Sequence, residues 1–173
     1  LLGRSGVGKT ALVHEVVRRR MDKNDEQSNE RRQMWLISPQ RLISGMSYVG
    51  QWENRVHAIL SECRRRSHVL YFDDFIGLFR AGISASSKIS AAQVLKPHIE
   101  KHEVRLLVEM TPDQFRVLQE LDRGFADLFH IIPVDEPDEE ENLRILIHSQ
   151  RELEARHKCR FQYDVLPTSM DLM

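Results

Sequence analysis

The chain has 173 residues, of which 41% are hydrophobic and 29% are charged, and this is typical of a single globular domain. Its 25 basic and 26 acidic side chains leave a formal net charge of -1, so nucleic acid is not an expected partner. No apolar run approaches the roughly 20 residues that span a bilayer, so no membrane partner is expected either. Two cysteines, Cys63 and Cys159, are too few for a disulfide framework and favour a cytoplasmic location.

The first segment opens inside a motif and without an initiator methionine, so we expect a piece of a longer protein. Leu1 and Leu2 have the apolar character of a strand end, and a glycine-rich loop follows at residues 3–10. The apolar side chains that predict a buried helix after this loop are Ala11, Leu12, Val13, Val16 and Val17. Residues 22–32 contain no apolar side chain and predict a solvated loop.

Short apolar runs predict further strands at residues 34–37, 69–72, 104–108 and 131–132. Helical spacing between and after these strands gives two candidate helix faces. The first consists of Trp52, Val56, Ile59, Leu60 and Cys63, and the second of Leu143, Leu146, Ile147 and Gln150. Thr111 before Pro112 predicts a capped helix start, and Pro137 is predicted to lie in the first turn of another helix. Apolar strands that alternate with helices indicate an α/β fold with a parallel sheet sandwiched by helices.

Residues 3–10 (GRSGVGKT) match the pattern G-x-x-x-x-G-K-[ST] in full. Glycines let consecutive amides approach phosphate oxygens, and a helix that begins near Lys9 adds its positive end. Lys9 would reach the β- and γ-phosphates of ATP, and the Thr10 hydroxyl would coordinate Mg²⁺. The predicted nucleotide-binding residues are Gly3, Ser5, Gly6, Val7, Gly8, Lys9, Thr10 and Ala11.

An acid that holds magnesium is expected at the end of a neighbouring strand, and Asp73 follows the apolar run 69–72. Asp73 and Thr10 therefore form the predicted metal site. Asp74, one residue later, is predicted to orient the attacking water as a catalytic residue. Considered alone, the two aspartates would be solvated side chains at a strand end, but the complete phosphate loop favours the functional interpretation.

Together these segments resemble the Clp-type AAA+ ATPases, specifically the first ATPase domain of the ClpB disaggregase group. The similarity extends from residue 1 to about residue 165. It is carried by residues 6–13 (GVGKTALV), 42–53 (LISGMSYVGQWE), 95–97 (LKP), 111–115 (TPDQF) and 134–137 (VDEP). The resemblance implies a P-loop AAA+ large subdomain at residues 1–165, with residues 166–173 as the start of the lid or a tail.

The same resemblance implies a hexameric ring that uses ATP to pull unfolded polypeptide through a central channel. Tyr48, Val49 and Gly50 would form the pore loop that contacts this substrate, because an aromatic ring beside glycine can hold any unfolded chain. Thr111 would be the catalytic sensor near the γ-phosphate. Simpler roles remain open, since Tyr48 could pack at the base of its loop and Thr111 could serve only as a helix cap.

The sequence departs from the family pattern at catalytic positions. The family usually has glutamate where this chain has Asp74, and aspartate is one methylene shorter. It also has two arginines where this chain has Asp127 and Leu128, and Arg123 lies too early to replace them. An arginine finger is worth about 10³ to 10⁵ in turnover, so slow hydrolysis is expected.

The sequence therefore favours a subunit of a Clp-like ring that binds Mg-ATP, hydrolyses it slowly and remodels proteins. One alternative is a signal-transduction P-loop switch, in which ATP or ADP sets a conformation and no substrate is threaded. Another is a ring subunit that binds ATP without hydrolysing it. Tyr48 and Gly50 favour the first interpretation, whereas Asp74 and the missing arginines favour the others.

Overall fold

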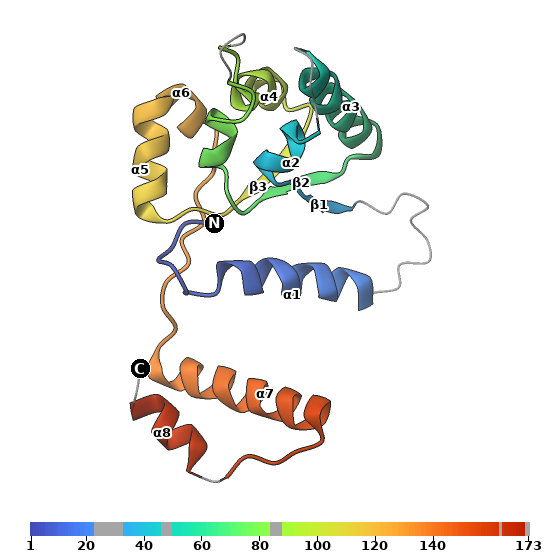
Figure 1. The fold of residues 1–173 in the computed structure, drawn as a ribbon. Coiled ribbons are helices and arrows are strands. Elements are labelled where there is room, and N and C mark those ends of the chain that lie inside the picture. The colour runs from blue at the N-terminus through green and yellow to red at the C-terminus, as the bar shows by residue number, and fades with distance from the viewer. Residues whose placement is uncertain (23–32, 46–49, 84–87, 163, 172–173) are drawn as a thin grey trace. The chain divides into compact units, whose positions relative to one another are not determined.

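The computed structural model describes residues 1–22, 33–45, 50–83, 88–162 and 164–171. Contacts divide the chain into two compact units, Leu1–Val134 and Asp135–Met173, and each is described here by itself (Figure 1). The first unit contains α1 (Lys9–Asp22), β1 (Met34–Leu36), α2 (Pro39–Ile43), α3 (Gln51–Arg66), β2 (Val69–Phe72), the 3-10 helix η1 (Ile76–Phe79), α4 (Ala91–Glu100), β3 (Arg105–Val108), α5 (Pro112–Leu121) and α6 (Arg123–Ala126). The second contains α7 (Glu139–His157) and α8 (Val165–Asp171).

A parallel three-stranded sheet in the order β1-β2-β3 forms the centre of the first unit. In the register of β2 and β3, Tyr71 pairs with Leu107 and Phe72 with Val108. Leu2 extends this arrangement by single parallel bridges to Met110 on one side and Pro133 on the other. The prediction of a parallel α/β sheet is therefore confirmed, with the segment before the phosphate loop next to the end of β3.

The prediction of a strand at residues 131–132 is wrong in its position. The bridge forms at Pro133, where the Leu2 amide donates to the Ile132 carbonyl and the Val134 amide donates to the Leu2 carbonyl. Ile131 and Ile132 are 43% and 50% exposed, so their apolar character does not report a buried strand.

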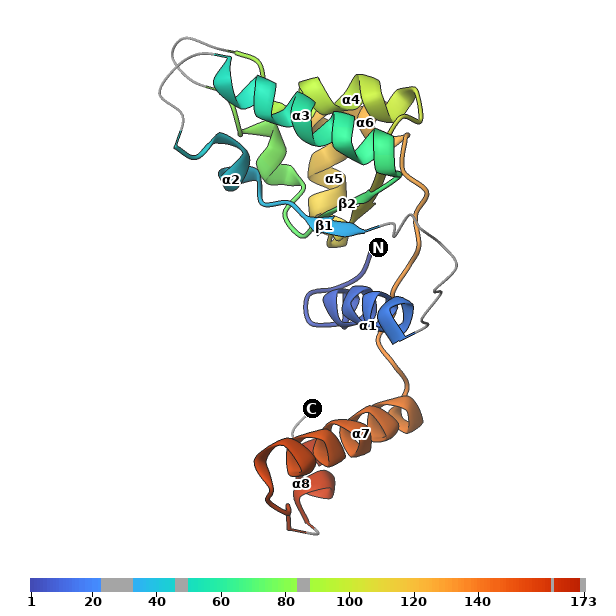
Figure 2. The ribbon, with the colours of Figure 1, turned by 90° about the vertical axis from the view of Figure 1, so that its right-hand side faces the viewer.

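Helices cover both faces of the sheet: α3 and α4 lie across one face, and α1 lies on the opposite side (Figures 1 and 2). On the first face the main core joins Leu70, Phe72 and Val108 to buried residues of α3 and α4. The predicted α3 face is confirmed, because Trp52, Val56, Leu60 and Cys63 are buried and Ile59 packs against them. Alternation along β2 then turns Tyr71 toward the α1 side.

The prediction that α1 is a buried helix is wrong for part of its apolar surface. Val13 is only 3% exposed, but Leu12 and Val16 are 49% and 45% exposed, and Ala11 is also exposed. Positions 9, 13 and 17 share one face at helical spacing, while positions 12 and 16 lie about 100° around the axis. Only the first of these faces is well covered.

An aromatic cluster fixes the segment after β2 against α6. The ring of Phe75 lies edge-on to those of Phe72, Phe79, Phe125 and Phe129, at centroid distances of 5.7, 6.2, 5.3 and 5.3 Å. Phe75 is 1% exposed. Such edge-to-face pairs add to the stabilisation that burial alone provides.

The second unit begins with a capping box rather than with a proline in the first turn. The Asp138 carboxylate accepts from the Glu141 amide at 2.8 Å, so α7 starts at Glu139 and Pro137 precedes the cap. No residue of α7 is buried, and its predicted face (Leu143, Leu146, Ile147 and Gln150) is only partly covered. Contacts divide the chain after residue 134, and the subdomain boundary expected at residue 165 stays a prediction. Within the described part of the chain, no helix has the length and apolarity to cross a membrane.

Phe75→Ala is expected to lower the free energy of unfolding of the first unit by about 3–5 kcal/mol, because it leaves a cavity inside four aromatic contacts. Urea denaturation followed by circular dichroism measures this. Leu121→Ala is the control, since Leu121 is 53% exposed, and it should cost about 1 kcal/mol or less. Equal losses in the two variants would contradict the central role of Phe75.

Candidate functional site

The loop at residues 3–10 adopts a conformation that its glycines require. Gly6 and Gly8 have φ values of 82° and 95°, in the region that favours glycine. A Cβ at either position would meet no atom within 4 Å, so the space beside them is open. Gly3 is constrained by packing instead, because a Cβ there would lie 2.3 Å from the carbonyl oxygen of Val134.

Lys9 begins α1 and folds back over its own loop. Its Nζ donates to the carbonyl oxygens of Gly3 at 2.8 Å and Arg4 at 2.7 Å, and the residue is only 9% exposed. Ser5 and Ala11 are exposed, and Val7 is half-buried. A lysine held inside the loop by two carbonyls is placed to exchange them for phosphate oxygens.

Thr10 connects the loop to the sheet through Glu109. The Thr10 hydroxyl donates to Glu109 Oε2 at 2.8 Å, and the Tyr71 hydroxyl donates to Glu109 Oε1. Glu109 follows β3 and is 6% exposed. Sequence analysis missed this residue, although its position directly after an apolar strand, like that of Asp73, is the signal that could have found it.

Tyr71 acts as a hydrogen-bond donor to Glu109. Burial raises the pKa of its phenol above the ordinary value, and the hydrogen bond to Glu109 raises it further, so the hydroxyl stays protonated at neutral pH. Asp73 directly follows β2 and is exposed, and its negative charge also raises the pKa of Tyr71. Thr10, Asp73 and Glu109 are therefore associated with the carboxyl ends of β2 and β3.

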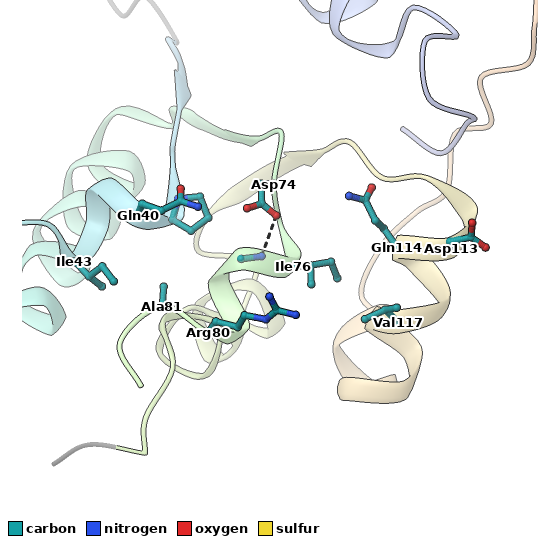
Figure 3. A pocket seen from close by; sticks show the side chains of 11 residues that line it. Gln40, Ile43, Asp74, Ile76, Arg80, Ala81, Asp113, Gln114 and Val117 are labelled. Atoms are coloured by element: carbon teal, nitrogen blue, oxygen red, sulfur yellow. Dashed lines mark hydrogen bonds between the residues drawn. The ribbon is translucent and has the colours of Figure 1, made fainter. Parts of the chain in front are cut away.

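Asp74 is engaged elsewhere. Its Oδ1 accepts from the Gly77 amide at 3.0 Å, and a Cβ at Gly77 would lie 2.5 Å from Oδ2, so glycine permits this approach. Asp74 lines a hollow of about 510 Å³ together with residues of α2, the η1 segment and α5. Figure 3 shows the side chains that surround this hollow. Among the described residues, none of the phosphate loop lines it. Asp74 thus stabilises the start of η1 in this structure.

Thr111 forms a helix cap. Its hydroxyl accepts from the Gln114 amide at 3.2 Å, and the Gln114 side chain accepts from the Thr111 amide at 2.8 Å. This capping box fits the simpler interpretation of the residue, and its place one residue after Met110 puts it near the Leu2 bridge. Its role as a sensor stays a prediction.

The segment with the missing arginines is held by an ion pair. Lys96 Nζ lies 2.8 Å from the Asp122 carboxylate, which also caps α6 by accepting from the Phe125 amide. The lysine holds the pKa of Asp122 below its ordinary value. Asp127 and Leu128 follow α6 and are exposed, as is Arg123 at its start. Lys96 of the Leu-Lys-Pro tripeptide thus connects α4 to the start of α6, just before Asp127 and Leu128.

Part of the predicted pore segment lies outside the described residues, namely Tyr48 and Val49. Gly45 and Gly50 border it with φ values of 72° and 89°, and Gly50 is the N-cap of α3. Positive φ at both positions explains why glycine stands on either side of this segment.

The residues present fit a nucleotide with its magnesium ion. The open glycine turns leave room for phosphates, and Lys9 supplies a buried positive charge. The Thr10 hydroxyl lies beside carboxylate oxygen, the ligand type that Mg²⁺ prefers. Within the described residues, no group of three or more His, Cys, Asp or Glu side chains forms a separate metal site.

The chain is similar to known chaperone proteins. The ClpB chaperones of Aquifex aeolicus and Porphyromonas gingivalis are each 30% identical to the chain over 99% of its length. The chain spans only 17% and 20% of those proteins. A closed-state cryo-EM reconstruction of Hsp104 with ATPγS and FITC casein matches 99% of the chain with 27% identity and a TM-score of 0.80, and the match covers 29% of that chain. An S. cerevisiae Hsp104-ADP complex matches 93% with 27% identity and a TM-score of 0.71, covering 22% of that chain.

A family model described as "ATPase family associated with various cellular activities (AAA)" matches residues 1–134, the same range as the first compact unit. The match includes the phosphate loop and the three strands. The chain therefore belongs to the AAA family of ATPases, and within it resembles the Clp-type chaperones ClpB and Hsp104.

Proposed function

We propose that the chain binds Mg-ATP as part of a Clp-like AAA+ ring that remodels proteins. One observation carries the proposal: Lys9 and Thr10, at the start of α1, meet a glycine loop and the carboxyl ends of central parallel strands. In open α/β sheets, ligands bind at this edge. The loop amides and Lys9 would hold the phosphates, and magnesium would neutralise charge on the β- and γ-phosphates.

Lys9→Ala should reduce ATP affinity by tenfold or more, because it removes the buried cation of the loop. Isothermal titration calorimetry in the presence of Mg²⁺ measures the change. Lys88→Ala removes an exposed lysine and should leave affinity unaltered. Equal affinity of the wild type and Lys9→Ala would refute nucleotide binding by this loop.

Ring assembly and threading of polypeptide are supported by the relatives. Solved Hsp104 structures contain casein, and the chain matches one of these over 99% of its length. The chain spans about a fifth of the curated ClpB proteins, so this part of the proposal concerns a longer assembly. Tyr48 would contact the substrate in it.

In such an assembly, Tyr48→Ala should impair remodelling of unfolded casein several-fold while ATP binding stays unchanged, since the ring face that holds the polypeptide is lost. Processing of fluorescently labelled casein is measured by fluorescence, and ATP affinity by calorimetry. Tyr48→Phe keeps the ring and should retain most activity. A fully active Tyr48→Ala variant would remove the residue from the substrate path.

A ring subunit that binds ATP without hydrolysing it is the second candidate. The contact between Asp74 and the Gly77 amide favours it, because a carboxylate that accepts this hydrogen bond is not free to orient water. The exposed Asp127 and Leu128 in place of arginines also favour it. ATP binding would then be retained although ATP hydrolysis is slow or absent, because only interactions that are stronger in the transition state raise the rate.

Wild-type turnover should therefore fall well below the ordinary range of about 1–100 per second. Arginines introduced at Asp127 and Leu128 should raise it only at protein concentrations that allow assembly, because a finger acts across an interface. Steady-state phosphate release against protein concentration tests this, with Arg123→Ala as the companion variant. Ordinary wild-type turnover that collapses in Arg123→Ala would assign the finger to Arg123 instead.

A further inference from the structure

Glu109 is the most buried carboxylate among the described residues. It is 6% exposed, and both of its carboxylate oxygens accept hydrogen bonds. The donors come from opposite sides of the site: Thr10 belongs to the first turn of α1, and Tyr71 belongs to the central strand β2. Glu109 therefore contacts the phosphate loop directly, although the loop motif does not include it.

Glu109 and Asp73 directly follow the last residue pair of β3 and β2. Phe72 pairs with Val108, and the Glu109 amide donates to the Phe72 carbonyl at 3.0 Å as part of this last pair. Each acidic residue therefore comes one step after the same pair, at the carboxyl end of its strand. The contacts of Glu109 with Tyr71 and Thr10 place its side chain on the α1 side.

Because its two hydrogen-bond donors are neutral, the charge of Glu109 affects how the loop binds phosphates. Two hydroxyls satisfy its oxygens, but they are neutral and leave its negative charge in place. A buried charge interacts more strongly than an exposed one because less water screens it. Glu109 thus opposes a bare triphosphate in the loop and favours a nucleotide whose charge is partly neutralised by a divalent cation.

We propose that Glu109 is a positioning residue of the nucleotide site: it holds the Thr10 hydroxyl and makes nucleotide binding depend on a divalent cation. This inference rests on the proposed binding of ATP by residues 3–10. The sequence pattern gives only Thr10 and Asp73 to the magnesium site, and this inference adds Glu109 as the residue that holds Thr10. It also explains why a carboxylate is buried directly after β3.

The measurement is the ratio of ATP affinities with Mg²⁺ and with EDTA, determined by calorimetry on the whole chain. Glu109→Gln keeps the size of the side chain and removes its charge. ATP affinity in EDTA should then rise, affinity in Mg²⁺ should fall, and the ratio should drop on the order of tenfold. Mn²⁺ bound in the presence of ADP, followed by electron paramagnetic resonance, should weaken in parallel.

Two variants serve as controls. Glu120→Gln and Glu139→Gln make the same charge change on exposed residues of α5 and α7, and they should leave the ratio unchanged. If Glu109→Gln does not fold, as judged by circular dichroism, Glu109→Ala in the Tyr71→Phe background removes the charge without leaving the phenol unpaired.

The outcomes separate the two proposals. A ratio that drops in the Glu109 variants and not in the controls supports the role of Glu109. A wild type that binds ATP with Mg²⁺, together with a Glu109→Gln variant of equal ratio, overturns that role and leaves nucleotide binding intact. Equal losses in Mg²⁺ and EDTA also overturn it, because they indicate a structural residue. A wild type that binds ATP under neither condition overturns both.

Discussion

The hydrogen bond from the Thr10 hydroxyl to Glu109 joins the phosphate loop to the sheet, and the rest of the site depends on it. A glycine loop has little stiffness of its own, since Gly6 and Gly8 contribute no side chain to packing. Helix α1 is covered along only one face, around Val13. The connection through Glu109 to Tyr71 therefore fixes the start of α1 over the carboxyl ends of β2 and β3.

On the other face of the sheet, apolar packing and a few polar contacts hold the elements that surround the site. The Phe75 cluster fixes the chain after β2 against α6. The ion pair of Lys96 and Asp122 then connects α4 to the start of α6. As a result, the surface that carries Asp127 and Leu128 is set by the core, and a change in its charge need not disturb the fold.

The sequence predicted the features that depend on local pattern. Strand β2 was predicted with its observed bounds, because its apolar run is short and ends at Asp73. The helix after Thr111 was predicted from a cap that the structure contains. The predictions failed where tertiary contacts decide: Leu12 and Val16 are apolar but exposed, and Ile131 and Ile132 lie before their bridge. Glu109 was missed because its partners are 99 and 38 residues away in the chain.

Gly3 has a mechanical consequence. Its Cα side faces the Val134 carbonyl with no clearance for a methyl group, and Leu2 is hydrogen-bonded to both Ile132 and Val134. Val134 is also the last residue of the first unit. The backbone that starts the phosphate loop is therefore held by main-chain hydrogen bonds to the last residues of the first unit. A substitution at position 3 would have to displace main-chain atoms at Val134, not a flexible side chain.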